Sequence, residues 1–287
     1  MNISVVGAGR VGTAMAVLLG RAGHRIVAVA GRGSTRDRAT RFLPDVLFLD
    51  PADAARAGEL VIVGVPDDDI RVIVGQIAGA DGFRSGQWLA HLSGAAGLDP
   101  LSAGRAAGAR PLALHPLQTF PDVAGALDRL PGCAMAVTAE DAEGYAIGER
   151  IADDLMARPF RLDDAMRPLY HAAAVFASNY LIVASAIAED LFRRAGVPDP
   201  LGAMLPLQRA SLDNVERLGP ADALTGPAVR GDATTIERNL AALRASRPDA
   251  VVPYVALCHA ALELSSNAGR LPAQRRAAVE EVLARWS

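Results

Sequence analysis

Three glycines near the start of the chain constrain its fold more than any other feature. Gly7, Gly9 and Gly12 follow the mostly apolar residues 3–6 and open an amphipathic pattern, so the motif G-x-G-x-x-G joins an expected strand to an expected helix. There the first glycine permits a tight turn, the second lets the backbone approach a pyrophosphate, and the third lets helix and strand pack closely. The N–H groups at the helix start bind phosphate. The sequence predicts a dinucleotide site with Arg10 and Val11 as further contacts; a plain glycine turn is the alternative.

The end of the second expected strand indicates which dinucleotide is bound. An acidic residue there would bind the ribose 2′-hydroxyl of NAD, but residues 30–36 read Ala-Gly-Arg-Gly-Ser-Thr-Arg. Arg32 can hold a 2′-phosphate with its planar guanidinium, and Ser34 can donate a further hydrogen bond. We therefore expect NADP(H), although a solvated basic loop would have the same composition.

The fourth expected strand ends in the same part of the sheet. Val65 and Pro66 follow it and are expected to pack on the ribose or nicotinamide. Three aspartates come next, at positions 67–69. Consecutive side chains cannot all converge on one ion, so we interpret these aspartates as a solvated turn and helix N-cap, and expect no metal site.

Residues 1–161 and 162–287 differ in their hydrophobic patterns. The first part alternates short apolar runs with helical patterns, which predicts an α/β fold with a doubly wound Rossmann sheet. The second part contains one helical pattern after another, which predicts an all-helical substrate or dimerisation domain. The expected strands are 3–6, 26–30, 46–48, 60–65, 88–92, 111–114 and 134–137. The main expected helices are 12–21, 70–78, 163–195, 201–217, 234–245, 250–268 and 272–286, with Thr234 and Glu237 as a capping box.

Composition excludes several classes of function. The net charge is −3, so the chain lacks the basic excess of a nucleic-acid-binding protein. Residues 170–188 are apolar, but they are alanine-rich and include a histidine and an asparagine, so we expect a buried helix and no membrane span. The two cysteines, Cys133 and Cys258, match no metal spacing, and with no secretory signal pattern they suit a reducing, cytoplasmic location.

Several motifs together carry a resemblance to a known family. The chain resembles Rossmann-like candidate oxidoreductases whose helical C-terminal domain is catalogued as a domain of unknown function. The resemblance implies the fold and an NADP cofactor, and it spans nearly the whole sequence. In layout the chain is also similar to pyrroline-carboxylate reductases, 6-phosphogluconate-type dehydrogenases, prephenate dehydrogenases and deazaflavin-dependent NADP reductases. The matching segments are Gly7–Gly12, His91–Gly94, Leu114–Phe120, Tyr170–Tyr180 and Leu224–Asp232.

The resemblance also suggests catalytic candidates. Prephenate dehydrogenases carry a His-Pro pair after a Rossmann strand and a serine at the end of the preceding strand, which correspond to His115 and Ser93. His115 would then exchange the proton that accompanies hydride transfer. The 6-phosphogluconate-type enzymes place a lysine and an asparagine on the long helix; this chain has no lysine there but has His171 and Asn179. Arg230, in a loop rich in glycine and proline, could bind a substrate carboxylate or pair with a neighbouring acid.

These observations predict an NADP(H)-dependent oxidoreductase for a small carbonyl, imine or hydroxyl substrate. The alternatives are a non-catalytic NADP(H)-binding sensor or regulatory protein and a prephenate-type dehydrogenase, because fold alone does not fix function. We also expect a homodimer through the helical domain. A long helix that is apolar on all sides must be covered on all sides, and a two-fold partner is the commonest cover.

Overall fold

The computed structural model describes residues 1–286, which form two compact units. The first unit is Met1–Asn179, and the second begins at Tyr180. The predicted sequence domains, 1–161 and 162–287, place the boundary before the first long helix, whereas in the structure the start of that helix belongs to the first unit. The boundary after residue 161 stays a prediction.

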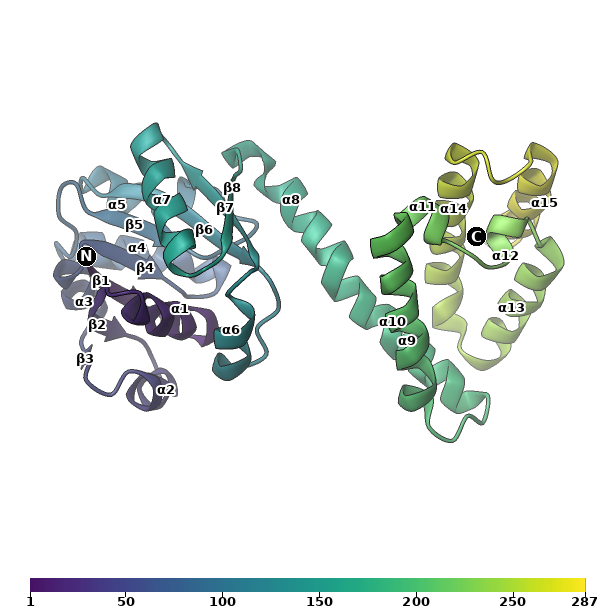
Figure 1. Ribbon diagram of the computed structural model, residues 1–287, viewed down its shortest axis with the longest axis horizontal. Coiled ribbons are helices and arrows are strands. Elements are labelled where there is room, and N and C mark those ends of the chain that lie inside the picture. The colour runs from purple at the N-terminus through teal and green to yellow at the C-terminus, as the bar shows by residue number, and fades with distance from the viewer. Residues whose placement is uncertain (287) are drawn as a thin grey trace. The chain divides into compact units, whose positions relative to one another are not determined.

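The first unit is built on one eight-stranded sheet with the order β3-β2-β1-β4-β5-β6-β7-β8 (Figure 1). All neighbouring strands are parallel except β6 and β7, which are antiparallel. This arrangement confirms the predicted doubly wound α/β fold. The strands are β1 (Asn2–Val6), β2 (Arg25–Ala30), β3 (Leu47–Phe48), β4 (Leu60–Val63), β5 (Trp88–His91), β6 (Arg110–Leu117), β7 (Ala134–Ala139) and β8 (Arg158–Arg161).

Helices cover both faces of this sheet (Figure 1). Side chains alternate along a strand, so Ile3 and Val5 of β1 enter one hydrophobic core and Val6 enters the other. Because both faces are buried, the strands are continuous apolar runs, which is why they could be found in the sequence. One face carries α1 (Arg10–Arg21), α6 (Val123–Arg129) and α7 (Ala142–Asp154); the other carries α3 (Pro51–Ala57), α4 (Asp67–Gly79) and α5 (Ser102–Ala106); α2 (Thr35–Phe42) follows β2.

The helical segment after β8 differs from the single helix expected over residues 163–195. It begins with a 3-10 turn, continues as α8 (Arg167–Ala174), passes through a π-helical stretch (Val175–Asn179) and ends as α9 (Tyr180–Arg194). The helical segment Asp164–Arg194 is long and apolar enough to cross a membrane by length and composition, and the apolar window within it is not buried. The expectation of a buried helix is therefore wrong for the chain by itself: Ile182 is 64% exposed.

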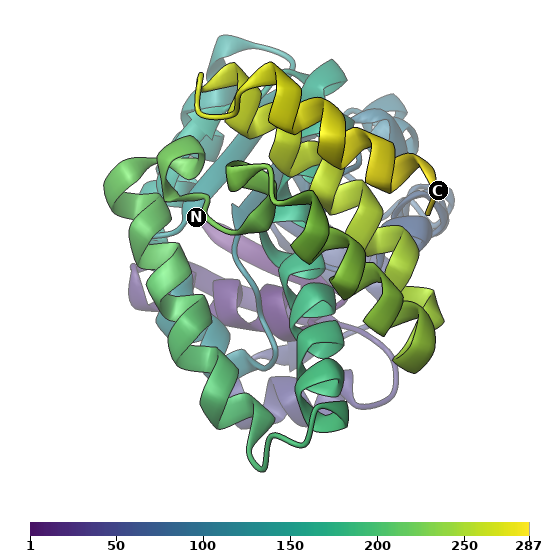
Figure 2. The ribbon, with the colours of Figure 1, turned by 90° about the vertical axis from the view of Figure 1, so that its right-hand side faces the viewer.

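The second unit contains the remaining helices, which are drawn in green to yellow in Figure 2. They are α10 (Pro200–Leu218), α11 (Pro220–Ala223), α12 (Pro227–Arg230), α13 (Ala233–Ser246), α14 (Val251–Asn267) and α15 (Ala273–Ala284). Its core lies among α13, α14 and α15, with Leu240, Leu262 and Leu283 buried. The predicted capping box is wrong. Asp232 caps α13 because its carboxylate accepts the N–H of Thr235, which leaves Thr234 inside the first turn.

Candidate functional site

The loop after β1 has the geometry that its glycines require. Gly7 has a φ of +80°, which side chains disfavour, and a Cβ there would lie 2.4 Å from Cγ1 of Val65. A Cβ on Gly12 would lie 3.2 Å from both the Gly7 carbonyl oxygen and Cγ1 of Val5. The turn at Gly7 and the close packing at Gly12 therefore depend on glycine in the structure as well as in the motif.

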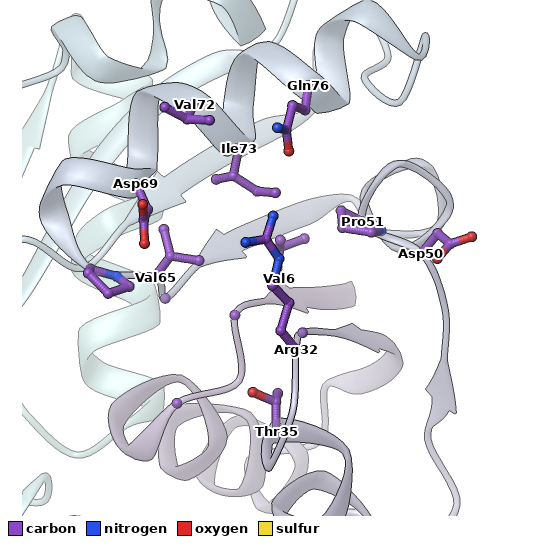
Figure 3. Close-up of a pocket in the computed structure, with 15 residues that line it drawn as sticks. Val6, Arg32, Thr35, Asp50, Pro51, Val65, Asp69, Val72, Ile73 and Gln76 are labelled. Atoms are coloured by element: carbon purple, nitrogen blue, oxygen red, sulfur yellow. The ribbon is translucent and has the colours of Figure 1, made fainter.

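The glycine loop lines one wall of a pocket of about 640 Å³ at the carboxyl ends of the strands (Figure 3). A Cβ on Gly9 would meet no atom closer than 3.5 Å, so glycine is not needed there to avoid a clash within the protein. A larger side chain at position 9 would instead extend into the pocket. The lining residues are Val6, Gly7, Gly9, Gly31, Arg32, Thr35, Asp50, Pro51, Gly64, Val65, Pro66, Asp69, Val72, Ile73 and Gln76.

Arg32 is the cationic residue of this pocket. Its side chain extends from the end of β2 toward the middle of the pocket, between Val65 and Pro51, while the carboxylate of Asp50 points away from it (Figure 3). Arg32 is exposed, so its guanidinium can receive an anion that enters the pocket.

The other predicted cofactor contacts are placed differently around the pocket. Val65 and Pro66 line it, whereas Ser34, Arg10 and Val11 are not among its lining residues. Ser34 is exposed at the N-cap position of α2 and makes no side-chain cap hydrogen bond. Their roles stay predictions.

Arg38 of α2, which was not predicted as a site residue, contacts the glycine loop. Its Nη1 donates to the carbonyl oxygen of Ala8 over 3.1 Å. Arg38 therefore holds the glycine loop against the helix that follows Arg32, and no motif signalled this contact.

Strand register brings the pocket next to the catalytic candidates. Val63 of β4 pairs with His91 of β5, and His91 pairs with Ala113 of β6. Two residues further along these three segments are Val65, Ser93 and His115. The carboxyl edge of the sheet therefore leads from the pocket wall at Val65 past Ser93 to His115.

His115 lies in a cluster with two residues of α8. Its Nδ1 is 2.7 Å from the hydroxyl oxygen of Tyr170, and its ring centroid is 6.5 Å from that of His171. A Cβ on Gly94 would lie 2.8 Å from Nε2 of His115 and 2.9 Å from Cδ2 of His171, so the loop after β5 packs against both rings. The structure thus brings together three of the predicted site residues, Ser93, His115 and His171, and adds Tyr170.

The hydroxyl of Ser93 does not bond His115 but contacts the start of α4. It donates to Oδ2 of Asp67 over 2.6 Å and accepts the N–H of Ala96 over 3.0 Å. Asp67 belongs to the first turn of α4, whose N-cap position is Pro66, so the predicted capping role of the aspartates is wrong.

Among residues 1–286, no group of three or more histidine, cysteine, aspartate or glutamate side chains could hold a metal ion.

Two histidines of the site are neutral at physiological pH. Burial, together with the positive charge of Arg167, lowers the pKa of His115 to about 4. Burial likewise lowers the pKa of His91 to about 4. The backbone N–H of Ser93 donates to Nδ1 of His91, so the His91 proton is on Nε2 and is donated to the carbonyl oxygen of Gly97.

Tyr170 and Arg167 complete the cluster. Burial raises the pKa of Tyr170 to about 12, so its phenol keeps its proton. Arg167 is 0% exposed, and burial lowers its pKa to about 10, which leaves it charged at neutral pH. Neither residue was predicted as a site residue. Their signal was the helical spacing Arg167, Tyr170, His171 (i, i+3, i+4), which places all three on one face.

Two predicted site residues lie outside this cluster. Asn179 is exposed, eight residues beyond His171 and therefore about 12 Å further along the helical segment. Arg230 belongs to the second unit, where it ends the short helix α12 instead of lying in a loop, and it is exposed. Hydrogen bonds from Thr235 lower the pKa of Asp232, and the charge of Arg230 adds a smaller effect in the same direction. Substrate binding by Arg230 stays a prediction.

The comparison with protein families covers most of the chain. Residues 1–116 match the Rossmann-like domain, and residues 133–261 match the domain of unknown function DUF2520. The two matches indicate a Rossmann-like domain followed by a domain similar to DUF2520. This combination agrees with the resemblance seen in the sequence motifs. No protein of curated function matches the chain in sequence.

Solved structures share this architecture over nearly its whole length. A candidate NADP oxidoreductase of Bacteroides fragilis is 28% identical, with a TM-score of 0.76 over 91% of this chain and 98% of that one. A protein of Thermotoga maritima is 21% identical, with a TM-score of 0.72 over 94% and 100%. An imine reductase of Myxococcus stipitatus, in complex with NADP+, is 16% identical, with a TM-score of 0.66 over 100% and 99%. The last two likenesses show the fold alone.

Proposed function

We propose that this protein is an NADP(H)-dependent oxidoreductase that transfers a hydride to or from a small carbonyl, imine or hydroxyl compound. The observation that carries the proposal is the strand-end edge that leads from the pocket wall at Val65 to the hydrogen-bonded pair of His115 and Tyr170. A pocket that fits a dinucleotide and a histidine–tyrosine pair that can exchange a proton lie along the same edge of the sheet, and hydride transfer requires both.

The pocket residues fit a dinucleotide. Gly7 and Gly9 expose the backbone to a pyrophosphate, and the start of α1 offers free N–H groups. Arg32 would bind a 2′-phosphate, and Val65 would pack on the nicotinamide end. NADPH supplies a hydride when bound. The likeness to the candidate NADP oxidoreductase and to the NADP+ complex of the imine reductase supports the same cofactor.

The pair of His115 and Tyr170 would hold the proton that accompanies the hydride. Neutral His115 carries one N–H, so the hydrogen bond has two arrangements. If Tyr170 donates to Nδ1, Nε2 of His115 bears a proton and can give it to a substrate oxygen or nitrogen while Nδ1 takes the phenol proton, which leaves Tyr170 as a phenolate that water must reprotonate. If Nδ1 donates to Tyr170, Nε2 can accept a proton. The same pair can therefore serve reduction and oxidation.

Cofactor titration tests the first part of this proposal. NADPH should bind more tightly than NADH, and Arg32→Ala should weaken NADPH about tenfold or more, since a lost charged hydrogen bond costs about 1.5–3 kcal/mol. NADH affinity should hardly change. Arg36→Ala is the matched control, because Arg36 lies four residues further and stacks over Phe48, 4.5 Å from the ring centroid. Equal losses for both cofactors, or equal losses in both variants, would exclude Arg32 as the 2′-phosphate ligand.

Turnover tests the second part. NADPH oxidation, followed by its absorbance with a panel of small ketones, aldehydes and cyclic imines, should reveal at least one substrate. A protein that binds NADPH tightly and oxidises it with no member of a broad panel would support the non-catalytic sensor instead.

We also propose that the second unit pairs with a second copy of itself. Large apolar side chains are exposed along α9 and α10, among them Ile182, Leu207 and Leu212. A lipid bilayer fits this surface poorly because α9 is too short to span it. The start of the helical segment contacts the sheet through Arg167 and Tyr170, so only the 15 residues of α9 are left to enter a membrane. A membrane-spanning helix needs about 20 apolar residues, and α9 ends in charged side chains. A two-fold partner of the same shape and polarity would cover it.

A further inference from the structure

We propose that Arg167 is the positioning residue of this site: it fixes the first turn of α8 to the strand ends so that Tyr170 meets His115. The structural part of this inference stands on the contacts of Arg167 alone. Only its consequence for turnover rests on the proposed oxidoreductase function.

Each nitrogen of the guanidinium binds a different segment of the sheet. Nη1 donates to the carbonyl oxygen of Ser93 over 2.7 Å, and Nη2 donates to that of Ala113 over 2.8 Å. Nε donates to Oγ1 of Thr138 over 2.9 Å, and Thr138 in turn donates to the carbonyl oxygen of Leu162. One side chain thus joins the segment after β5, the strand β6, the strand β7 and the segment after β8.

The position of Arg167 on α8 determines which residues it orients. Arg167 is the first residue of α8 and is followed by Pro168, which suits a first turn. Tyr170 and His171 lie three and four residues later, on the same face of the helix. Fixing this face to Ala113 places Tyr170 beside His115, which lies two residues beyond Ala113 on β6.

Burial distinguishes this role from that of a substrate-binding arginine. Arg167 is 0% exposed, and all three of its nitrogens already have acceptors in the protein. The carboxylate or phosphate of a substrate outside the protein core therefore cannot reach the guanidinium. Leaving a buried charge there without these acceptors would be strongly unfavourable, so the contacts are mutually dependent.

Arg167 also acts on the charge state of the site. The groups that face His115 are Tyr170, His171 and Arg167 from α8, Asp67 from α4 and His91 from β5. The permanent positive charge among them is that of Arg167, which opposes protonation of His115. The residue that orients the pair thus also keeps its imidazole neutral.

NMR of the whole protein tests the anchoring directly. An Nε–H that is buried and bonded to Thr138 should exchange slowly with water, and Thr138→Val should remove its protection. In Arg167→Lys, an ammonium cannot reproduce the planar three-way contact, so the resonances of the His115 ring should shift. In Arg167→Met, the pKa of His115 should rise by about 1. Arg161→Lys is the matched control, because Arg161 pairs with Glu149 at the surface and should leave His115 unchanged.

Kinetics separates positioning from substrate binding, with a compound that the wild type reduces. Arg167→Lys should lower kcat by about 10²-fold while KM and NADPH affinity stay within about twofold. A raised KM with normal kcat would mean that Arg167 binds substrate, and would overturn the proposal. So would unchanged His115 resonances in Arg167→Lys. If neither Arg167 variant folds, the wild-type Nε–H decides: rapid exchange at neutral pH would refute the anchoring, whether or not the protein is an oxidoreductase.

Discussion

Protonation of His115 should destabilise the first unit in a defined pH range. Its pKa is 6.5 in an unfolded chain and about 4 in the folded protein, a difference worth about 3 kcal/mol. Between these two values the unfolded chain binds the proton and the folded protein does not. The contribution to stability is therefore complete above pH 6.5 and is lost as the pH falls toward 4. From pH 7 to pH 4.5 the expected loss from His115 is about 2 kcal/mol.

Urea unfolding of wild type and His115→Asn at several pH values measures this contribution. Trp88 is buried in β5 and reports on the first unit, so Trp286→Phe is introduced in both proteins to silence the second unit. Carboxylates and His91 titrate in both proteins, and only the difference between the two pH profiles belongs to His115. The variant should lose about 2 kcal/mol less than the wild type between pH 7 and pH 4.5. Parallel profiles would show that the pKa of His115 is not lowered, and would refute its buried, neutral state.

Three further outcomes are expected. Gly9→Val should abolish NADPH binding without unfolding the chain, because the new side chain enters the pocket and meets no protein atom closer than 3.5 Å at its Cβ; retained affinity by fluorescence titration would contradict the pyrophosphate assignment. His115→Asn should lower turnover of an identified substrate by about 10²–10⁴-fold with NADPH affinity almost unchanged; near-normal turnover would transfer the proton role to His171 or to water. Light scattering should give a dimer mass, and a value near the single-chain 29.9 kDa would refute the pairing of second units.

The sheet could be predicted from sequence because its strands are buried on both faces. Their apolar runs stand out between glycines and helical patterns, and the glycine loop fixes where the cofactor pocket lies. The strand β8, Arg-Pro-Phe-Arg, was missed because an edge strand with exposed ends has no apolar run. The π-helical stretch Val175–Asn179 was missed because hydrophobic spacing does not distinguish it from an α-helix.

The site was only partly predictable because it depends on strand register and on the docking of α8. Arg32 follows from its distance after the glycine motif and Val65 follows from a strand end, whereas His115 and Ser93 follow from the resemblance to prephenate dehydrogenases. Arg167 carries no signal in isolation: a lone arginine at a helix start usually lies in solvent, and its burial results from three acceptors on distant segments. Asn179, in contrast, was predicted as a site residue but lies outside the cluster, because two residues eight positions apart on one helix are about 12 Å apart along its axis.

A crystal structure of the protein with NADP+ bound tests the central claim most directly. We expect the 2′-phosphate on the guanidinium of Arg32, the pyrophosphate against Gly7 and Gly9, and nicotinamide C4 facing an open polar space beside His115 and Tyr170. A nicotinamide enclosed by apolar side chains, with C4 turned away from His115 and Tyr170, would contradict the oxidoreductase assignment and favour an NADP(H) sensor.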